Sequence, residues 1–252
     1  MNPLGAATGL FTIIPVRAFE VDRRLAARAM AAFPWLGLLI GAAGGAVMFG
    51  AWHLAGPFLG AMLGLALLAG VTGAMHLDGV ADTADGLGSR RPPAEALVIM
   101  RRSDIGPMGV ATLVLVLLID AAALASMPTS LLGGVALASA AAAGRLGITV
   151  ASVSKLSARQ QGFGALFVGV TKFSTAAITL VGVAGVVLGG AWWAGGYQTL
   201  LAAAIGLTAA ALVGALWSRH LVTRLGGWTG DTFGSLIEVI QTVFLVAFAL
   251  AA

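Results

Sequence analysis

The chain has 252 residues, of which 59% are hydrophobic and 10% are charged, and its mean hydropathy is +0.99. A soluble domain of this length keeps far more polar surface, so the composition indicates a protein with several membrane spans. No cysteine is present, which excludes disulfides, thiolate metal sites and thiol nucleophiles. The net charge of +4 does not indicate nucleic-acid binding, because the cations lie between apolar runs and do not form one basic face of a soluble fold.

The N-terminal segment, residues 1–15, has no basic region before its apolar part and no small-residue cleavage site. We therefore expect it to be retained and not to be removed as a signal peptide. We also expect it to lie in the membrane interface, as an amphipathic or re-entrant piece.

Seven apolar runs follow, each of about 20 residues and so long enough to cross a bilayer. They cover residues 32–55, 57–75, 106–126, 131–150, 175–194, 200–217 and 234–251. The predicted fold class is therefore all-α: a polytopic integral membrane helical bundle of about seven transmembrane helices. We expect one membrane-embedded domain over residues 1–252.

The basic residues are distributed unevenly between the two ends of these spans. All 14 Lys and Arg residues fall on one side of the predicted bundle, and the loops on the opposite side, around residues 56, 127–130 and 195–199, have none. The positive-inside rule makes the basic side cytoplasmic. The same side holds nearly all of the acidic residues and the longest loops, so the chemistry is expected there.

An aspartate-rich segment directly follows the second apolar run. Asp78, Asp82 and Asp85 are spaced i, i+4 and i+7, which places them on one face of a helix, and His76 precedes them. Three like charges so close together repel one another, and a divalent cation is the simplest way to neutralise them. A solvated loop with scattered acids is the alternative, but only ten residues of the chain are acidic. Carboxylates of this kind hold Mg²⁺ in phosphoryl transfer.

A second polar segment covers residues 99–109. Arg101 and Ser103 are donors suited to phosphate oxygens, and Asp104 is a further candidate metal ligand or base. Ordinary cytoplasmic flanking charge explains this segment equally well.

A third polar segment, residues 225–238, is rich in glycine and contains Asp231 and Glu238. These two acids are seven residues apart, so both can face inward from the start of the last span. Acids inside a span are candidate functional residues, although Glu238 paired with Arg145 as a structural contact is the alternative. Arg145 itself either reaches the interface or binds phosphate.

At these residues the chain resembles the cobalamin-5′-phosphate synthase family, the adenosylcobinamide-GDP ribazoletransferases. The resemblance rests on His-Leu-Asp-Gly-Val-Ala-Asp-Thr-Ala-Asp-Gly at 76–86, on segment 99–106, on Gly-Phe-Gly at 162–164, and on Gly-Gly-Trp-Thr-Gly-Asp at 226–231 with Glu238. Two positions depart from the family pattern. Arg102-Ser103-Asp104 stands where the family usually reads Asp-Ser-Arg, and Gln241 stands where it tends to have a second Glu.

The resemblance implies a reaction that completes the nucleotide loop of vitamin B12 in the cytoplasmic (inner) membrane of a bacterium or archaeon. The ribose 3′-hydroxyl of alpha-ribazole or its 5′-phosphate attacks the cobinamide-side phosphate of adenosylcobinamide-GDP, and GMP leaves. Besides these substrates and the lipid bilayer, a homo-oligomer and other enzymes of nucleotide-loop assembly are candidate partners.

The site residues follow from the residue pattern and this reaction together. Mg²⁺ is expected on Asp78, Asp82 and Asp85. The catalytic set is expected to be Asp82, Asp85, Asp104 and His76, and the substrate-binding set Arg101, Ser103, Arg145, Asp231 and Glu238. The general base is left open between Asp104, Asp231 and His76.

Two other functions fit parts of this pattern. A phospholipid-forming CDP-alcohol phosphotransferase shares the Asp-x-x-Asp-Gly pattern, here Asp82 to Gly86. The His76-Leu-Asp78 prefix and the Thr229-Gly-Asp231 segment separate the two families, because both fit the cobalamin enzyme. A secondary transporter suits seven spans with glycine breaks, but the acids gather at the cytoplasmic edge and no internal repeat is visible.

Overall fold

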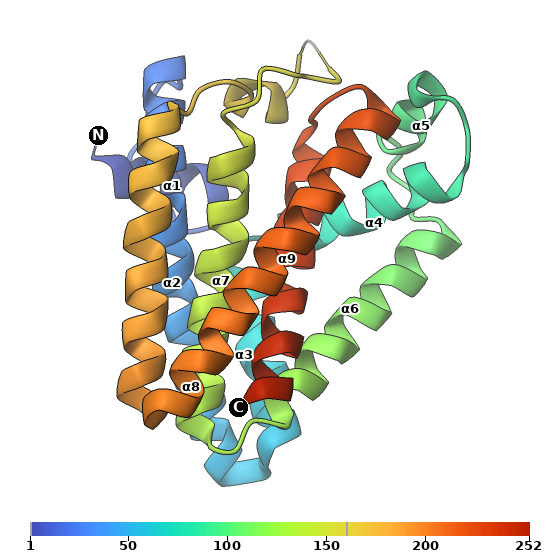
Figure 1. Ribbon diagram of the computed structural model, residues 1–252. Helices are drawn as coiled ribbons and strands as arrows, with labels where there is room; N and C mark the ends of the chain where they lie inside the picture. Colours follow the sequence, from blue (N-terminus) through green and yellow to red (C-terminus); the bar gives the residue numbers. More distant parts are fainter. Residues whose placement is uncertain (1, 160) are drawn as a thin grey trace.

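The computed structural model describes residues 2–159 and 161–252, which leaves Met1 of the N-terminal segment outside, and within these ranges it is helical with no β-strand (Figure 1). The elements in chain order are α1 (Pro3–Phe11), α2 (Arg23–Ala55), α3 (Pro57–Val71), α4 (Met75–Gly88), α5 (Pro93–Ile99), α6 (Pro107–Ala125), α7 (Ser130–Ala151), the 3-10 turn η1 (Gly164–Phe167), α8 (Phe173–Leu225) and α9 (Gly230–Ala251).

Local sequence signals explain where the helices begin. A proline occupies the first turn of α1, α3, α5 and α6, where its missing N–H is not needed. Asp22 and Thr129 cap α2 and α7 by accepting backbone N–H groups, and Thr229 and Thr232 form a reciprocal capping box at α9. The start of α9 beside the predicted site is therefore well defined.

Among the residues that the structure describes, five helices are long and apolar enough to cross a membrane: α2, α6, α7, α8 and α9. A sixth crossing results if α3 and α4 count as one bent span, so the expected number of about seven is not confirmed by this criterion. α8 is assigned as a single helix across a kink at Gly196, whose φ is 73°, and its two arms coincide with the expected runs 175–194 and 200–217. Figure 1 shows the chain turning back at this kink.

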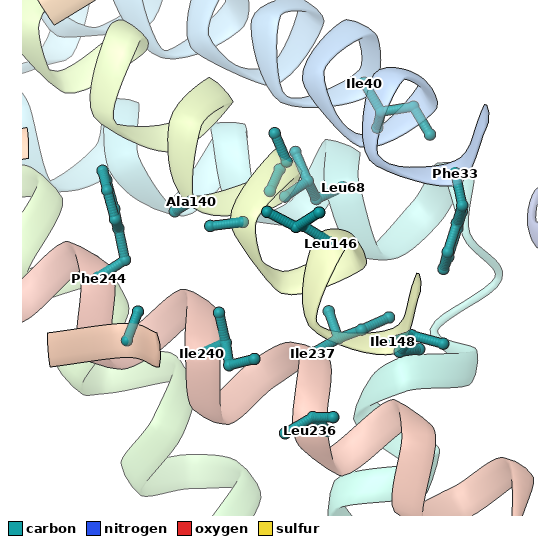
Figure 2. Close-up of a cluster of buried hydrophobic side chains, with 14 of the residues drawn as sticks. Phe33, Ile40, Leu68, Ala140, Leu146, Ile148, Leu236, Ile237, Ile240 and Phe244 are labelled. Carbon is teal, nitrogen blue, oxygen red and sulfur yellow. The ribbon is translucent and has the colours of Figure 1, made fainter. Parts of the chain in front are cut away.

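α7 lies at the centre of the bundle and packs against α2, α8 and α9. Figure 2 shows the apolar side chains of α2, α7 and α9 that meet there, including Phe33, Leu146 and Ile237. The α2–α7 contact is close because it uses glycines: a Cβ at Gly45 would lie 2.7 Å from the carbonyl oxygen of Gly134. Small residues let membrane helices approach and pack in this way.

The chain bends near the C-terminal end of the expected second span, residues 57–75. α3 ends at Val71, and the chain turns by 90° into α4. Gly73 and Ala74 have φ of 59° and 57°, and this left-handed pair makes the turn that a hydrophobicity pattern does not reveal. As a result α4 runs across the bundle, against α6 and α9 (Figure 1).

The N-terminal helix α1 packs against the start of α2 and buries Ala6, Ala7 and Phe11. The expectation that this segment lies in the membrane interface stays a prediction.

Candidate active site

The aspartate-rich helix α4 and the start of α9 cross with almost no space between their backbones. A Cβ at Gly79 would lie 2.6 Å from the carbonyl oxygen of Asp231, and a Cβ at Gly234 would lie 3.2 Å from the Cα of His76. Glycine is required on both sides of such a contact. The crossing brings Asp78 and Asp82 of α4 beside Asp231 of α9, although the two segments are about 150 residues apart in the sequence.

Two cavities adjoin this crossing. A polar cavity of about 400 Å³ is lined by residues of α4, α9 and the loop between α5 and α6, and a more apolar one of about 380 Å³ lies under α1 and η1. They share one wall, made of Asp78, Arg101, Arg159 and Asp231. This wall places two carboxylates and two guanidinium groups at the junction of a charged space and an aromatic one.

The polar cavity gathers most of the predicted site residues. Asp78, Asp82, Arg101, Ser103 and Asp104 all line it. Arg102 lines it as well. The exchanged Arg-Ser-Asp order therefore still supplies one acidic and one basic side chain to the same cavity. The expectation that segments 76–86 and 99–109 come together is therefore consistent with the fold.

The acids of the polar cavity repel one another. Burial, followed by the neighbouring carboxylates of Asp78, Asp231 and Asp85, raises the pKa of Asp82 to about 7, against a lowering by Arg159. A cation among these groups would relieve the repulsion. In the described part of the chain, however, no three His, Asp or Glu side chains are arranged as a complete metal site. Substrate phosphates and water would therefore have to supply part of the coordination of any cation held among these carboxylates.

Asp85 differs from the other two aspartates in what it contacts. Its two carboxylate oxygens accept hydrogen bonds from the backbone N–H groups of Gly106 and Gly109, at 2.7 and 2.8 Å. A carboxylate at the first turn of a helix stabilises that helix end. Asp85 thus fixes the start of α6 and the end of the loop that carries Arg101, and it does not line either cavity.

Arg159 is a site residue that the sequence pattern did not reveal, because it is one of several cations in a cytoplasmic loop. Its Nη1 donates to the Asp231 carboxylate at 3.0 Å and its Nη2 to the carbonyl of Leu97 at 3.0 Å. The loop itself is held against the turn before α9 by two backbone hydrogen bonds of Trp228, to Leu156 and Ala158. Only this tertiary contact carries Arg159 to the cavity wall.

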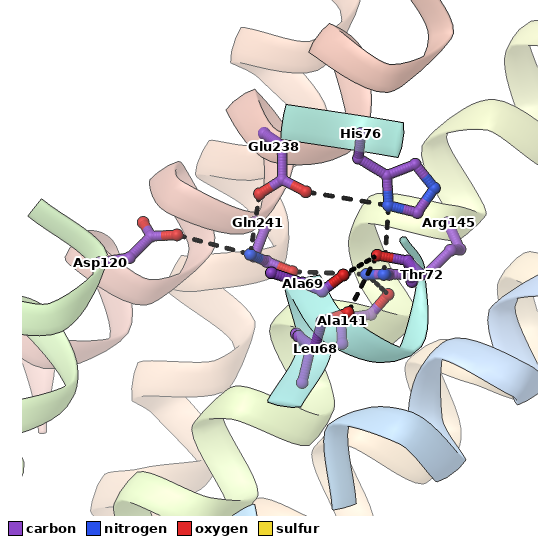
Figure 3. A network of polar contacts seen from close by, with 9 residues as sticks. All are labelled: Leu68, Ala69, Thr72, His76, Asp120, Ala141, Arg145, Glu238 and Gln241. Atoms are coloured by element: carbon purple, nitrogen blue, oxygen red, sulfur yellow. Dashed lines mark hydrogen bonds and ion pairs between the residues drawn. The ribbon is translucent and has the colours of Figure 1, made fainter. Parts of the chain in front are cut away.

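Glu238 and Arg145 lie away from both cavities, in a buried polar network between the helices (Figure 3). Arg145, only 1% exposed, donates to the carbonyl of Ala141 and to the side-chain oxygen of Gln241. Gln241 in turn donates to Glu238 at 3.1 Å and to Asp120 at 3.4 Å. Gln241 therefore links α6, α7 and α9, which gives the departure from the family pattern a structural role.

His76 connects this network to the apolar cavity, which it also lines. Its Nδ1 lies 3.4 Å from Nη2 of Arg145. Because a guanidinium only donates, Nδ1 is the acceptor and the ring proton is on Nε2. The Glu238 carboxylate lies 3.9 Å from Nδ1, too far for a competing hydrogen bond. His76 thus offers an N–H donor, and not a basic nitrogen, on its remaining side.

A family model described as cobalamin-5-phosphate synthase matches residues 3–249. The chain belongs to this family. The match covers every element of the structure, from α1 to α9, and so includes both cavities.

Four similar curated proteins carry one name, adenosylcobinamide-GDP ribazoletransferase. Adenosylcobinamide-GDP ribazoletransferases of Frankia casuarinae and of a Roseiflexus species are 36% and 34% identical, over 96% and 99% of this chain and 92% and 90% of theirs. The enzyme of that name from Klebsiella pneumoniae is 37% identical over 87% of each chain. No solved structure matches the chain.

Proposed function

We propose that this protein is an adenosylcobinamide-GDP ribazoletransferase, which joins adenosylcobinamide-GDP to alpha-ribazole or its 5′-phosphate and releases GMP. The observation that carries the proposal is the shared wall of the two cavities, within a chain that belongs to the cobalamin-5-phosphate synthase family over nearly its whole length. A charged cavity with several carboxylates and arginines suits a pyrophosphate, and an aromatic cavity suits a nucleoside. The family match favours this activity over the CDP-alcohol phosphotransferase and the transporter.

Mg²⁺ is proposed as the cofactor, held by Asp78 and Asp82. Both carboxylates line the polar cavity, and the pKa of Asp82 is raised first by burial and then by three neighbouring carboxylates. A divalent cation bound there supplies charge neutralisation for the pyrophosphate. Asp85 is assigned the supporting role of holding the α6 end in place.

The remaining residues of the wall bind and orient the substrates. Arg101 and Arg159 donate to phosphate oxygens. The Arg101 side chain is exposed and can move, whereas Arg159 is anchored by its hydrogen bond to the carbonyl of Leu97. We assign the general base to Asp231, since it lines both cavities and so lies where a nucleoside hydroxyl would meet the phosphate. The hydroxyl loses its proton to this carboxylate, the new O–P bond forms at the cobinamide-side phosphate, and the P–O bond to GMP breaks.

The membrane orientation follows from the charge pattern. The site lies at the basic ends of the helices, so it is proposed to face the cytoplasm of a bacterial or archaeal cell. A homo-oligomer and contacts with other enzymes of nucleotide-loop assembly stay predictions.

The decisive experiment supplies the purified protein in nanodiscs with adenosylcobinamide-GDP, alpha-ribazole 5′-phosphate and Mg²⁺. Stoichiometric GMP and adenosylcobalamin 5′-phosphate are expected, with no product when Mg²⁺ is removed by a chelator. A folded protein that forms neither product, beside an active family member assayed in parallel, would refute the assignment.

A further inference from the structure

The apolar cavity, here called the aromatic chamber, is enclosed by segments that are far apart in the sequence. Its walls include the side chains of Phe11 from α1, Phe33 from α2, Phe163 and Phe167 around η1, and Phe233 from α9. Its volume of about 380 Å³ is in the range of cavities that enclose a small organic ligand. It is too small for a corrinoid, so it does not accommodate the larger of the two proposed substrates.

Four of these rings contact one another at an angle: Phe11 is tilted by 31° to Phe33 and by 46° to Phe167, and Phe163 lies edge to face with Phe167 at 73°. The Phe11 ring centroid lies 4.0 Å from that of Phe33 and 5.1 Å from that of Phe167, and Phe163 lies 5.0 Å from Phe167. Phe11, Phe33 and Phe167 are buried, whereas Phe163 is 47% exposed and stands at the edge. Rings arranged in this way offer a flat aromatic ligand both face-on and edge-on contacts.

The chamber has a polar group at one specific position. The His76 ring lies 6.0 Å from that of Phe33, and its Nδ1 is occupied by Arg145. The proton on Nε2 is consequently available as a hydrogen-bond donor. A ligand that combines a flat apolar body with an in-plane acceptor nitrogen matches both features.

The wall shared with the polar cavity determines how such a ligand is oriented. Asp78, Arg101, Arg159 and Asp231 are the residues common to both spaces. A heteroaromatic base in the aromatic chamber therefore directs its attached sugar toward the carboxylates, and not toward α1. This orientation brings a ribose hydroxyl to Asp231.

We propose that the aromatic chamber binds the flat heteroaromatic base of the acceptor nucleoside, with His76 donating to its ring nitrogen. The proposal rests on the proposed function for the identity of the nucleoside, and it makes Phe163 and His76 determinants of acceptor specificity. A lipid acyl chain is the competing occupant. It is disfavoured because four charged side chains form one wall of the chamber.

The first test measures binding of alpha-ribazole, without any corrinoid, to the full-length protein in nanodiscs by calorimetry. Phe163→Ala is expected to raise the dissociation constant for alpha-ribazole by about fivefold or more. This is the lower end of the effect of removing one aromatic side chain that stacks on a base. Phe173→Ala is the matched control, because Phe173 is 79% exposed at the start of α8 and does not line the chamber. Equal affinities for the two variants would overturn the proposal, as would a co-purified lipid that the nucleoside does not displace.

The second test addresses His76. The chain has three histidines, so ¹⁵N-histidine labelling gives three rings, and a variant combining His53→Gln with His220→Gln identifies the signals of His76. We expect the proton on Nε2 and a change in the Nε2 signal when alpha-ribazole is added. A proton on Nδ1, or no change on binding, would overturn the role of His76.

Steady-state kinetics distinguish binding of alpha-ribazole in the chamber from the chemical step. His76→Gln retains an N–H donor near the position of Nε2, so it should keep the KM for alpha-ribazole within about threefold, whereas His76→Leu should raise it about tenfold or more. Neither variant should change the KM for adenosylcobinamide-GDP. If the protein binds alpha-ribazole normally but gives no turnover, the proposed function is refuted and the binding role of the aromatic chamber is not. If turnover occurs but neither Phe163→Ala nor His76→Leu changes ribazole binding, the proposed role of the chamber is refuted and the proposed function is not.

Discussion

At the scale of single residues, the three aspartates of α4 have different surroundings despite their regular spacing. Asp78 and Asp82 face the polar cavity, whereas Asp85 is engaged by two backbone N–H groups at the start of α6. Helical periodicity correctly places the three on one side of a helix, but which of them stays free depends on where α6 begins. A tertiary contact therefore separates Asp85, which holds the start of α6, from Asp78 and Asp82, which line the cavity, although the three look alike in the sequence.

Replacing Asp82 by Asn should remove turnover without unfolding the protein. The change deletes a negative charge from the proposed cation site, and we expect kcat/KM to fall at least about 100-fold. Glu95→Gln is the control, because Glu95 is an exposed partner of Arg91 at 3.8 Å on the surface and should leave the rate unchanged. Activity within a few-fold of the wild type in Asp82→Asn would remove Asp82 from the site.

The raised pKa of Asp82 leads to a prediction about stability. Because its folded-state pKa of about 7 exceeds the ordinary value of about 3.9, the folded protein holds more protons between these values. The metal-free protein should therefore lose stability as the pH rises from about 4 through 7. Thermal unfolding in nanodiscs at pH 5, 6, 7 and 8 measures this.

Mg²⁺ should reverse that loss, since it binds the deprotonated carboxylate and competes with the proton. Its effect on the unfolding temperature is expected to be larger at pH 8 than at pH 5. Asp82→Asn should reduce both the pH dependence of the unfolding temperature and the pH dependence of the Mg²⁺ effect. A Mg²⁺ effect that is independent of pH, or that persists in the variant, would contradict the assignment.

At the scale of elements, the site depends on the α4–α9 crossing. Gly79→Ala places a methyl group 2.6 Å from the carbonyl oxygen of Asp231, which forces the two helices apart. Because displacing catalytic groups by about 1 Å can cost about 100-fold in rate, we expect a loss of about 10- to 100-fold. Gly70→Ala in α3 is the matched control, because its added methyl group meets nothing within 4 Å.

Both glycine variants require a check that the protein is folded, by gel filtration and thermal unfolding. A folded Gly79→Ala protein with wild-type activity would show that the close crossing does not position the site. Equal losses of activity in Gly70→Ala and Gly79→Ala would show that replacing a helix glycine lowers the activity wherever it lies, and not through the α4–α9 crossing.

At the scale of the whole molecule, the orientation in the membrane can be tested because the chain has no cysteine. Single cysteines at Ser174 and Ser126, both exposed and at opposite ends of the bundle, provide two probes. An impermeant maleimide added to intact spheroplasts should label Ser126→Cys only, and added to inverted vesicles it should label Ser174→Cys only. The reverse pattern would place the site outside the cytoplasm.

Much of the fold was predictable because it depends on local hydrophobicity. Apolar runs located the helices, and the one-sided distribution of basic residues matched the end of the bundle that carries the site. The bend at Gly73 and Ala74 was not predictable, since it is made by backbone angles within a continuous apolar pattern. The sequence offers a Glu238–Arg145 pair as a structural alternative, and the structure buries both residues in one network joined through Gln241. The further link from Gln241 to Asp120 is not predictable from the sequence, because it requires three helices to meet.

The buried network of Figure 3 also has a consequence for how the chain is made. Gln241 is synthesised 96 residues after Arg145, which at 5–20 residues per second is a delay of roughly 5–20 s. Of the three groups that contact the Arg145 guanidinium in the folded protein, His76 and the Ala141 carbonyl are already made in that interval and Gln241 is not. Inserting such a cation into a bilayer costs about 2.5–3.5 kcal/mol. Biogenesis therefore passes through a state in which α7 carries an incompletely paired charge, and a nascent chain arrested before α9 would present that charge to membrane quality control.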